Sequence, residues 1–311
     1  MIKSLKDLKI MLNIVEDARI PISSLAKKCR LKREVVQYRL KNLEKSIIAG
    51  YQARVNLLFL ADSIYTIYLN IPGLERHEII SKLKKLPRVH WIGSTLGRWN
   101  YILAFSVNQE NPLSKFLDEI SKTFEKNQIR YKLTQQIEEF KDSFGGLFNK
   151  NLLLTSQKRT RKIELDEIDI KIIENLTKNA RLSNSEIAEK VNMTREAVRM
   201  RIKNLEKTQV ILNYRTLIKP QALELENFFL AIKYPGNLED ISKISTFLCN
   251  NKSVSYVCTT AGDFNIISVI HLKSIKELDE VCSKIRKEFP SVMLEIETLP
   301  LVGVDSQNYL P

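Results

Sequence analysis

The sequence contains few of the residues from which cofactor sites and membrane spans are built. Only 9 glycines occur in 311 residues, and they are too scattered for a P-loop, a GxSxG nucleophile motif or a dinucleotide-binding fingerprint. The three histidines, His77, His90 and His271, are isolated and match no metal-ligand spacing. No run approaches the roughly 18 apolar residues that a membrane-spanning helix requires. These absences predict a chain with no metal, no cofactor, no catalytic residue and no membrane partner.

Cysteine is equally sparse. The four cysteines lie far apart and form no CxxC pair, which excludes a disulfide framework or a zinc site and indicates small buried side chains in a reducing compartment. They are Cys29, Cys249, Cys258 and Cys282. The first residues, MIKSLKDLKIML, carry a lysine at every third position and no apolar core, which is not the pattern of a secretory signal peptide. We therefore expect a cytoplasmic protein.

Acidic residues are outnumbered by basic ones. The chain has 49 Lys and Arg against 36 Asp and Glu, a formal net charge of +13. Residues 1–51 hold 12 basic and 5 acidic residues, about half of this excess. Such a balance suggests a polyanionic partner, nucleic acid before membrane, although lysine-rich proteomes also yield basic proteins without one.

One 13-residue segment occurs twice. Residues 33–45 read REVVQYRLKNLEK, and residues 195–207 read REAVRMRIKNLEK. Each copy has apolar residues at i, i+4 and i+7, which places them on one face of an α-helix: Val36, Leu40 and Leu43, then Val198, Ile202 and Leu205. The remaining faces are basic. A solvated surface helix would explain a single copy, whereas recurrence at a fixed offset indicates a duplicated module.

The repeat extends upstream into a unit of three helices. Residues 7–45 align with residues 169–207 without a gap, at an offset of 162. A first helix is predicted over 4–16 and again over 166–178. The second helix begins at Pro21 in one copy, and in the other at Ser183, which forms a capping-box pattern with Glu186.

A turn of about three residues then leads into the basic helix, and Thr194 is a suitable N-cap for the second copy. Two short helices, a tight turn and a longer amphipathic helix are typical of a helix-turn-helix, with the last helix in the recognition position. The stretches 47–51 and 210–214 each predict a short wing strand.

The repeat continues downstream with alternating strands and helices in the order βαββαβ, which is that of a ferredoxin-like domain. The first copy predicts strands up to Ile71 and over 89–96, 101–107 and 129–138, with helices over 76–86 and 112–125. The second predicts strands up to Tyr234 and over 254–260, 266–272 and 292–299, with helices over 238–249 and 275–288.

The fold class is therefore α+β, with two winged helix-turn-helix domains alternating with two ferredoxin-like domains. The expected limits are 1–55 and 164–220 for the winged helix-turn-helix domains, 56–150 and 221–311 for the ferredoxin-like domains, and 151–163 for a basic linker. The linker contains Lys158-Arg159-Thr160-Arg161-Lys162.

These motifs together resemble the Lrp/AsnC (feast/famine) family of bacterial and archaeal transcription regulators. Residues 165–169, LDEID, resemble the family's opening LDxxD, and residues 197–206 are similar to its recognition-helix pattern. The turn 262–265, GDFN, resembles the GDxD turn of the family's effector-sensing RAM-type domain. The resemblance covers nearly the whole chain as two family units in tandem. It implies a sequence-specific regulator that binds double-stranded DNA.

The residues expected to contact DNA follow from the basic helix faces. A major groove admits an α-helix, in which Arg or Lys bonds guanine and Gln bonds adenine. We expect base or groove contacts from Lys32, Arg33, Gln37, Tyr38, Lys41, Thr194, Arg195, Arg199 and Lys203. Phosphate contacts are expected from Lys27, Lys28, Arg30, Arg39 and Arg201, although Arg39 and Arg201 could instead pair with a glutamate of their own domain.

The family resemblance also implies an effector turn in each ferredoxin-like domain. The residues at these positions are Gly97, Arg98, Asn100, Gly262, Asp263 and Asn265. Asn100 and Asn265 replace the turn's last acid, and Arg98 replaces its first. Because the acids help to hold an amino-acid effector in the family, these replacements disfavour an amino acid and leave another small-molecule effector open.

Two other interpretations remain. Siroheme decarboxylases share this architecture, sometimes as a fused pair, and the chain could be such an enzyme. It could also be a protein-interaction module that has lost DNA binding, against which the two basic helices argue. The candidate turns contain one arginine and no histidine, so we expect a regulator that is not an enzyme. One chain supplies both ferredoxin-like sheets, and we expect these to pair as an intrachain pseudo-dimer, with further homo-oligomers left open. Tyr65, Ile67 and Leu69 are expected to face Phe228, Leu230 and Ile232 across that pairing.

Overall fold

The computed structural model describes residues 4–15, 17–148, 164–290 and 295–307. These residues form two compact units, and each takes elements from both halves of the chain. The helix-turn-helix unit contains described residues up to 59, then 143–148 and 164–225; the barrel unit contains 60–142 and 226–307. The predicted linker at 151–163 lies outside the described residues, and the predicted domain limits stay predictions.

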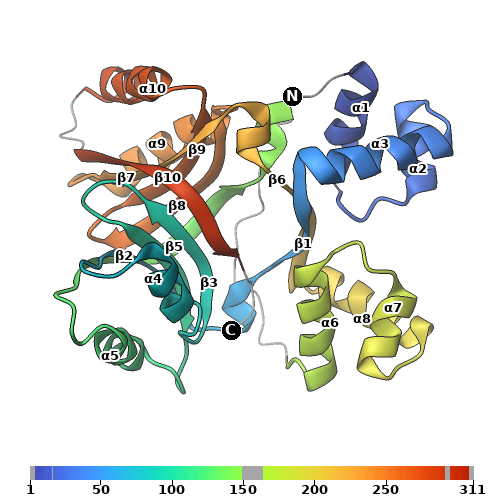
Figure 1. The fold of residues 1–311 in the computed structure, drawn as a ribbon, viewed down its shortest axis with the longest axis horizontal. Helices are drawn as coiled ribbons and strands as arrows, with labels where there is room; N and C mark the ends of the chain where they lie inside the picture. Colours follow the sequence, from blue (N-terminus) through green and yellow to red (C-terminus); the bar gives the residue numbers. More distant parts are fainter. Residues whose placement is uncertain (1–3, 16, 149–163, 291–294, 308–311) are drawn as a thin grey trace. The chain divides into compact units, whose positions relative to one another are not determined.

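The helix-turn-helix unit contains two bundles of three helices (Figure 1). The first comprises α1 (Leu5–Ile14), α2 (Ile22–Cys29) and α3 (Arg33–Ser46), and the second comprises α6 (Glu167–Lys178), α7 (Asn184–Val191) and α8 (Arg195–Lys207). The helices begin where their capping residues predict. Ser183 and Glu186 form the complete capping box of α7, and the Thr194 hydroxyl accepts from the amide of Ala197 at the start of α8.

The strands that follow the recognition helices are longer than predicted and pair with each other. β1 (Ile48–Val55) and β6 (Ile211–Ile218) form a two-stranded antiparallel sheet between the two bundles (Figure 1). Strand backbone groups need hydrogen-bond partners, and each strand finds them in its counterpart from the other half of the chain. A local pattern gives no sign of this partner, which is why the sequence predicted only a short wing in each copy.

The β1–β6 register has an approximate twofold symmetry. Tyr51 pairs with Thr216 and Ala53 with Tyr214, so the symmetry axis passes through the pair Gln52–Arg215. Both of these side chains are buried, and a guanidinium nitrogen of Arg215 donates to Oε1 of Gln52 at 3.3 Å. Two identical halves would place the same residue on both sides of this axis. The duplicated chain places an amide opposite a guanidinium instead.

Reciprocal contacts reinforce this symmetry. Nη1 of Arg19 donates to the carbonyl oxygen of Ala180 at 2.8 Å, and Nη1 of Arg181 donates to that of Ala18 at 2.8 Å. Each guanidinium also lies 5.2 Å from the ring centroid of a tyrosine in the other half, Tyr214 for Arg19 and Tyr51 for Arg181. These contacts link the two bundles on both sides of the symmetry axis.

The barrel unit contains the βαββαβ order twice. The first copy consists of β2 (Ser63–Asn70), α4 (Arg76–Leu83), β3 (Val89–Thr95), β4 (Tyr101–Val107), α5 (Leu113–Thr123) and β5 (Arg130–Asp142). The second consists of β7 (Glu226–Lys233), α9 (Leu238–Asn250), β8 (Val254–Gly262), β9 (Ile266–Leu272), α10 (Ile275–Glu288) and β10 (Glu295–Gln307). Short 3-10 helices occur at Leu57–Phe59, Phe144–Phe148 and Pro220–Leu223. Within the described residues, no helix combines the length and apolar character needed to cross a membrane.

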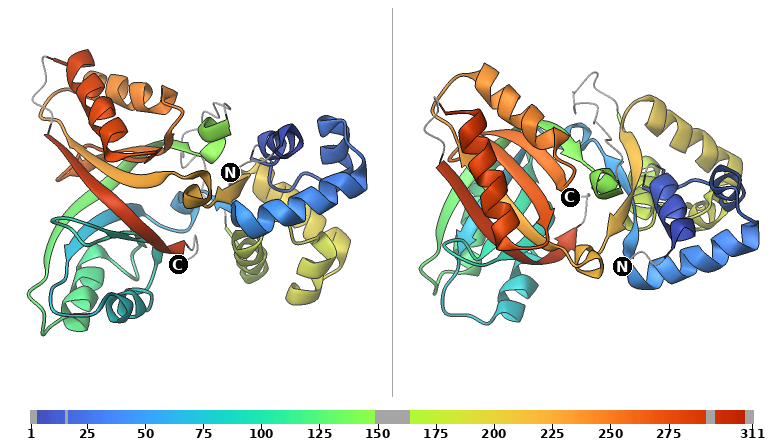
Figure 2. Two further views of the ribbon diagram at one scale, coloured as in Figure 1. Left: turned by 45° about the horizontal axis from the view of Figure 1, so that its top comes forward. Right: turned by 90° about the horizontal axis from the view of Figure 1, so that it is seen from above.

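The eight strands close into one barrel in the order β10-β3-β4-β2-β5-β8-β9-β7. The two ferredoxin-like sheets join at both edges, where β5 pairs with β8 and β10 pairs with β3 (Figure 2). β5 and β10 continue past the limits predicted for them, to Asp142 and Gln307, because each also serves the sheet of the other copy. The closed order leaves no free strand edge in the barrel.

The face predicted to join the two sheets is wrong. Ile67 and Leu69 pack with residues of α4 and α5, and Phe228, Leu230 and Ile232 pack with residues of α9 and α10. The layer between the sheets is instead built around Tyr68, Phe229 and Ala231. These strands are buried on both faces, so both faces are apolar and alternation does not tell them apart. Trp99 is buried in this inter-sheet layer and Trp91 packs against it.

The buried pair at the symmetry axis generates a first stability prediction. We expect Gln52→Arg to lower the free energy of unfolding of the helix-turn-helix unit by about 1–3 kcal/mol, because a second guanidinium would face Arg215 without water to screen it. Calorimetric unfolding of the full chain would measure this. Gln52→Glu is the matched control, since a carboxylate of the same length offers Arg215 an acceptor. Equal free energies of unfolding for Gln52→Arg and Gln52→Glu would show that the side chain at position 52 does not face Arg215.

His271 generates a second stability prediction, for the barrel unit. Its Nδ1 lies 2.7 Å from Oδ1 of Asn227 and its Nε2 lies 2.7 Å from the Ser255 hydroxyl, and burial lowers the pKa of the ring to about 4. In the unfolded chain His271 is protonated below about pH 6.5, whereas in the folded chain it is protonated only below about pH 4. Between these pH values the unfolded chain therefore binds one more proton than the folded chain. The neutral, buried His271 therefore contributes about 3 kcal/mol to the free energy of unfolding, and this contribution is complete above pH 6.5 and is lost as the pH falls to 4.

Unfolding with urea at several pH values between 4 and 7.5 would test this. We expect stability of the barrel unit to fall with acid in wild type and to fall less steeply in His271→Gln, which has no titrating ring. The same pH slope in both proteins would assign the acid sensitivity to other groups.

Candidate nucleic-acid interface

The two recognition helices bury one face and expose the other, as predicted. In α3 the buried residues are Val36, Leu40 and Leu43, and in α8 they are Val198, Ile202 and Leu205. The expected DNA-contacting side chains lie on the remaining surface. Lys32, Arg33, Gln37, Tyr38, Lys41, Thr194, Arg195 and Lys203 are exposed, and Arg199 is partly exposed.

Each helix also exposes a large apolar side chain at the same repeat position. Tyr38 is 68% exposed and Met200 is 56% exposed, although methionine is often buried in a folded domain. They stand directly after Gln37 and Arg199, the two polar side chains expected to read bases. Apolar groups at such positions suit the methyl group of thymine.

Arg199 has a local partner in the free protein. Its Nε donates to Oε2 of Glu196 at 2.8 Å, and this hydrogen bond lowers the pKa of the Glu196 carboxyl. The pair lies at the surface on successive turns of α8. Glu196 therefore orients the guanidinium of Arg199 along the surface of α8.

The turns before the recognition helices have the same backbone geometry in both copies. α2 ends at Arg30 with φ 55° and ψ 49°, and α7 ends at Asn192 with φ 53° and ψ 48°. Lys27, Lys28 and Arg30 are exposed around the first turn, where phosphate contacts were expected. The geometry places these charges beside the N-terminus of α3.

Arg39 and Arg201 are held within their own domains. Nη1 of Arg39 lies 2.9 Å from Oδ1 of Asp7, and Nη1 of Arg201 lies 2.8 Å from a carboxylate oxygen of both Asp166 and Asp169. The partners are aspartates of the first helix, where the sequence suggested glutamate. These bonds tie the recognition helix to the rest of its bundle, and we leave both arginines out of the proposed phosphate contacts.

In the two predicted effector turns, the asparagine side chains form hydrogen bonds with backbone groups. The Asn100 amide accepts from the N–H of Ile71 at 3.0 Å and donates to its carbonyl at 3.1 Å. Oδ1 of Asn265 accepts from the N–H of Tyr234 at 2.7 Å. Both asparagines thus fasten a β-hairpin to a neighbouring strand, and Gly97 and Gly262 supply the positive φ of 115° and 121° that the turns need.

The other polar groups of these turns differ. Arg98 is exposed and stacks over the ring of Trp99, whereas Asp263 accepts from the N–H of Leu133 in β5 at 2.9 Å. Sequence reasoning missed Lys132, whose Nζ lies 4.6 Å from the ring centroid of Phe264 and 5.9 Å from that of Trp99. Its position on β5 becomes informative only when both turns are brought to the same strand.

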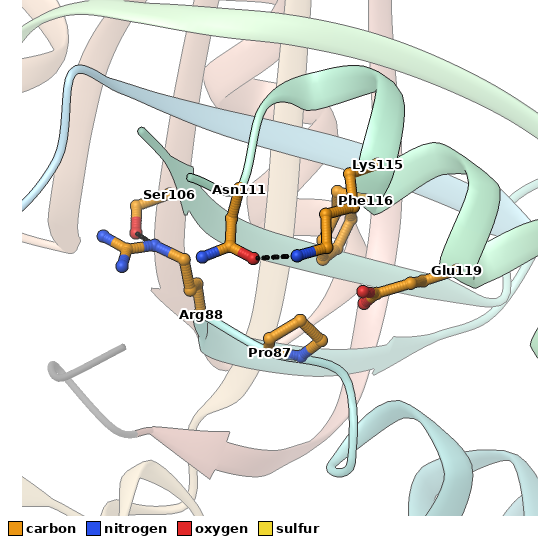
Figure 3. A pocket seen from close by; sticks show the side chains of 7 residues that line it. All are labelled: Pro87, Arg88, Ser106, Asn111, Lys115, Phe116 and Glu119. Carbon is orange, nitrogen blue, oxygen red and sulfur yellow. Dashed lines mark hydrogen bonds between the residues drawn. The ribbon is translucent and has the colours of Figure 1, made fainter. Parts of the chain in front are cut away.

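A small pocket lies beside α5 in the barrel unit (Figure 3). It has about 190 Å³ of empty volume, open solvent included, and is lined by Pro87, Arg88, Ser106, Asn111, Lys115, Phe116 and Glu119. Arg88 is engaged by the Ser106 hydroxyl and by the Leu60 carbonyl, to which it donates at 2.7 Å. Lys115 donates to Asn111 at 2.9 Å. The pocket is smaller than the roughly 300–1,000 Å³ typical of small-molecule sites.

Comparison with known proteins agrees with the helix-turn-helix geometry in both halves. Residues 165–206 match the AsnC-type helix-turn-helix domain, and residues 3–46 match a winged helix-turn-helix DNA-binding domain. The HTH-type transcriptional regulator LysM of Sulfurisphaera tokodaii is 33% identical over 40% of this chain and 86% of its own length. An uncharacterized HTH-type transcriptional regulator of Pyrococcus furiosus, PF2053, is 28% identical over 43% of this chain and 90% of its own.

A whole-chain likeness corrects one expectation. The crystal structure of the siroheme decarboxylase NirDL covers 98% of this chain and 93% of its own, with a TM-score of 0.67 and 13% sequence identity. At this sequence identity the likeness shows a shared fold only. That shared fold extends along the whole chain and is the fold of an enzyme. The expectation that the chain is not an enzyme is therefore wrong as drawn from the sequence. The same fold can carry unrelated functions, so the absence of catalytic motifs from the sequence did not exclude an enzyme.

The relatives match one family unit each, which is why they span most of their own length and less than half of this chain. The barrel and the paired bundles show that this chain contains the unit twice. By these matches and this architecture, the chain belongs to the Lrp/AsnC family of helix-turn-helix transcription regulators.

Proposed function

We propose that the protein is a sequence-specific regulator that binds double-stranded DNA in the cytoplasm through α3 and α8. The observation that carries this is the pair of exposed polar and basic helix faces held in one unit by the β1–β6 ladder. A helix of this width fits a major groove, and a twofold arrangement of two such helices fits two neighbouring grooves. One chain would supply both recognition helices.

The side chains support direct readout of different bases by the two helices. Gln37 and Tyr38 in α3 stand where Arg199 and Met200 stand in α8. Glutamine pairs with adenine, arginine with guanine. Family homodimers present identical helices and prefer palindromes, so this chain is proposed to prefer an asymmetric site of two unlike half-sites.

The barrel unit is proposed to form the pseudo-dimer core and to receive any effector at its hairpin turns. The exposed or partly exposed cations there, Arg98 and Lys132, lie over aromatic rings and favour an anionic or aromatic molecule over an amino acid. Further association of pseudo-dimers stays open.

A second candidate function is siroheme decarboxylation, which the whole-chain likeness to NirDL favours. A related structure of that enzyme is a co-complex with an iron-uroporphyrin III analogue. The pocket beside α5 does not fit a tetrapyrrole, which is larger than the drug-sized ligands that typical pockets hold. A tetrapyrrole would therefore need another site on this chain.

One pair of measurements separates the two functions. We expect gel shifts with duplex DNA whose affinity falls steeply with salt, because each neutralised phosphate releases counterions and contributes roughly −0.9 to the slope of log K against log salt. Siroheme added to the same preparation should leave its own visible spectrum unchanged. The absence of any shift, together with an altered siroheme spectrum, would replace the regulator by the enzyme.

The unlike helices predict an unequal response to mutation. Arg199→Ala should relax base preference at one half-site by about 1–3 kcal/mol for the lost contact and leave the other half-site unchanged. Binding selections from randomised duplexes would show this, with Gln37→Ala as the matched variant that affects the opposite half-site. Loss of preference at both half-sites in each variant would mean that the helices do not divide the site.

A further inference from the structure

The two helix-turn-helix bundles differ sharply in charge. Residues 4–46 contain 11 basic and 5 acidic residues, a net +6, whereas the aligned residues 166–208 contain 9 and 8, a net +1. The difference is concentrated in the turn before the recognition helix. Residues 27–32 read KKCRLK, and the aligned residues 189–194 read EKVNMT.

The basic side chains of residues 27–32, before α3, are exposed to solvent. Lys27, Lys28, Arg30 and Lys32 are all exposed, and in the part of the chain that the structure describes no acidic side chain pairs with them. In the second bundle Glu189 is exposed at the position of Lys27, and the carboxylate of Glu196 is already bonded to Arg199. The same surface is thus strongly cationic in one copy and close to neutral in the other.

The first copy gives up local stability at the position of Arg30. Both turns require a left-handed residue, with φ 55° at Arg30 and φ 53° at Asn192. Asparagine adopts this conformation more readily than other residues with a side chain, whereas arginine gains nothing locally from it. The residue with the better backbone fit is therefore present only where the surface is neutral.

The first copy also gives up a helix cap. Thr194 accepts from the amide of Ala197 and so satisfies an otherwise free N–H group at the start of α8. Lys32 occupies the same position before α3 and makes no side-chain cap hydrogen bond. A cation also lies unfavourably at the positive end of a helix dipole. At two positions, then, a positive charge stands where the fold alone favours asparagine or threonine.

From these two positions, where charge replaces a residue that suits the fold, we infer that the two bundles bind DNA unequally. The N-terminal bundle binds the phosphates of the duplex through Lys27, Lys28, Arg30 and Lys32. The C-terminal bundle contributes base recognition and binds phosphates only weakly. The inference rests on the proposed DNA-binding function. Phosphate contacts supply affinity without sequence information, and base contacts supply specificity. The N-terminal bundle then supplies most of the affinity for any duplex in addition to its own base contacts, whereas the C-terminal bundle acts mainly through base contacts.

The test exchanges residues between the copies in the full chain. Arg30→Asn with Lys32→Thr gives the first turn the residues of the second. We expect this variant to unfold at a higher temperature than wild type, yet to bind random-sequence duplex DNA on the order of tenfold more weakly at moderate salt, with a salt slope shallower by about 1.8. A purely structural role of the two residues would not weaken binding in a more stable protein.

Two further variants complete the test. Asn192→Arg with Thr194→Lys places the cations in the second bundle, and it should tighten binding and steepen the salt slope while lowering the unfolding temperature. Lys84→Asn with Lys85→Thr removes two exposed charges from the turn that follows α4 in the barrel unit as a control, and should keep the wild-type salt slope.

The outcomes separate the inference from the function beneath it. If wild type binds DNA and the Arg30→Asn, Lys32→Thr variant keeps the same slope, the unequal division is overturned and DNA binding stands. An equal loss in the Lys84→Asn, Lys85→Thr control would attribute the effect to net charge and overturn the division as well. If wild type shifts no duplex at low salt, the proposed function itself fails.

Discussion

The antiparallel pairing of β1 with β6 is the contact on which the arrangement of the helix-turn-helix unit depends. It satisfies the backbone of two strands that would otherwise be single, and it places Gln52 against Arg215 at the symmetry axis. A homodimer built from the second copy alone would bring two buried guanidinium groups together there, which costs several kcal/mol unless each finds a counter-charge. The pair is compatible with association of unlike halves and disfavours association of two second copies.

In a symmetric homodimer both halves carry the same residue at equivalent positions. Fusion of two copies in one chain allows the two halves to carry different residues there. Tyr68 and Ala231 occupy equivalent strand positions in the inter-sheet layer, one large and one small, and Tyr68 packs edge-on against Phe229 and Phe264. His271 bonds Ser255, and the equivalent positions in the first copy hold the same two residue types exchanged, Ser106 and His90. The recognition helices diverge in the same way. Unequal halves therefore characterise the core as well as the proposed DNA-binding surface.

The fold does not by itself choose between regulator and enzyme. The barrel and the paired bundles match a siroheme decarboxylase along the whole chain, whereas the helix-turn-helix sequences match DNA-binding regulators. What favours DNA is local chemistry at α3 and α8: an exposed Tyr38 and Met200, exposed cations, and a left-handed turn residue and an N-cap that carry positive charge in the first copy. Because these side chains are exposed, burial in the core does not account for them.

The sequence by itself determined the elements that depend on neighbours three or four residues away. The buried faces of α3 and α8, the capping box of Ser183 and Glu186, the N-cap at Thr194 and the order βαββαβ all follow from local spacing. The repeat offset also identified in advance which positions are equivalent. The basic residues of the first turn were likewise visible, since exposure of a lysine cluster needs no tertiary information.

Only the tertiary structure decided which distant segments meet. It paired β1 with β6 and β5 with β8, assigned the partners of Arg39 and Arg201 among the aspartates, and placed Lys132 over Phe264. It also decided which face of β2 meets the other sheet, because a strand apolar on both sides carries no periodic sign of its orientation. The arginine–aspartate pairs join residues 32 to 35 apart within one bundle, whereas the strand pairings join residues more than 100 apart and depend on the closed barrel and the symmetry axis. No spacing along the chain encodes them.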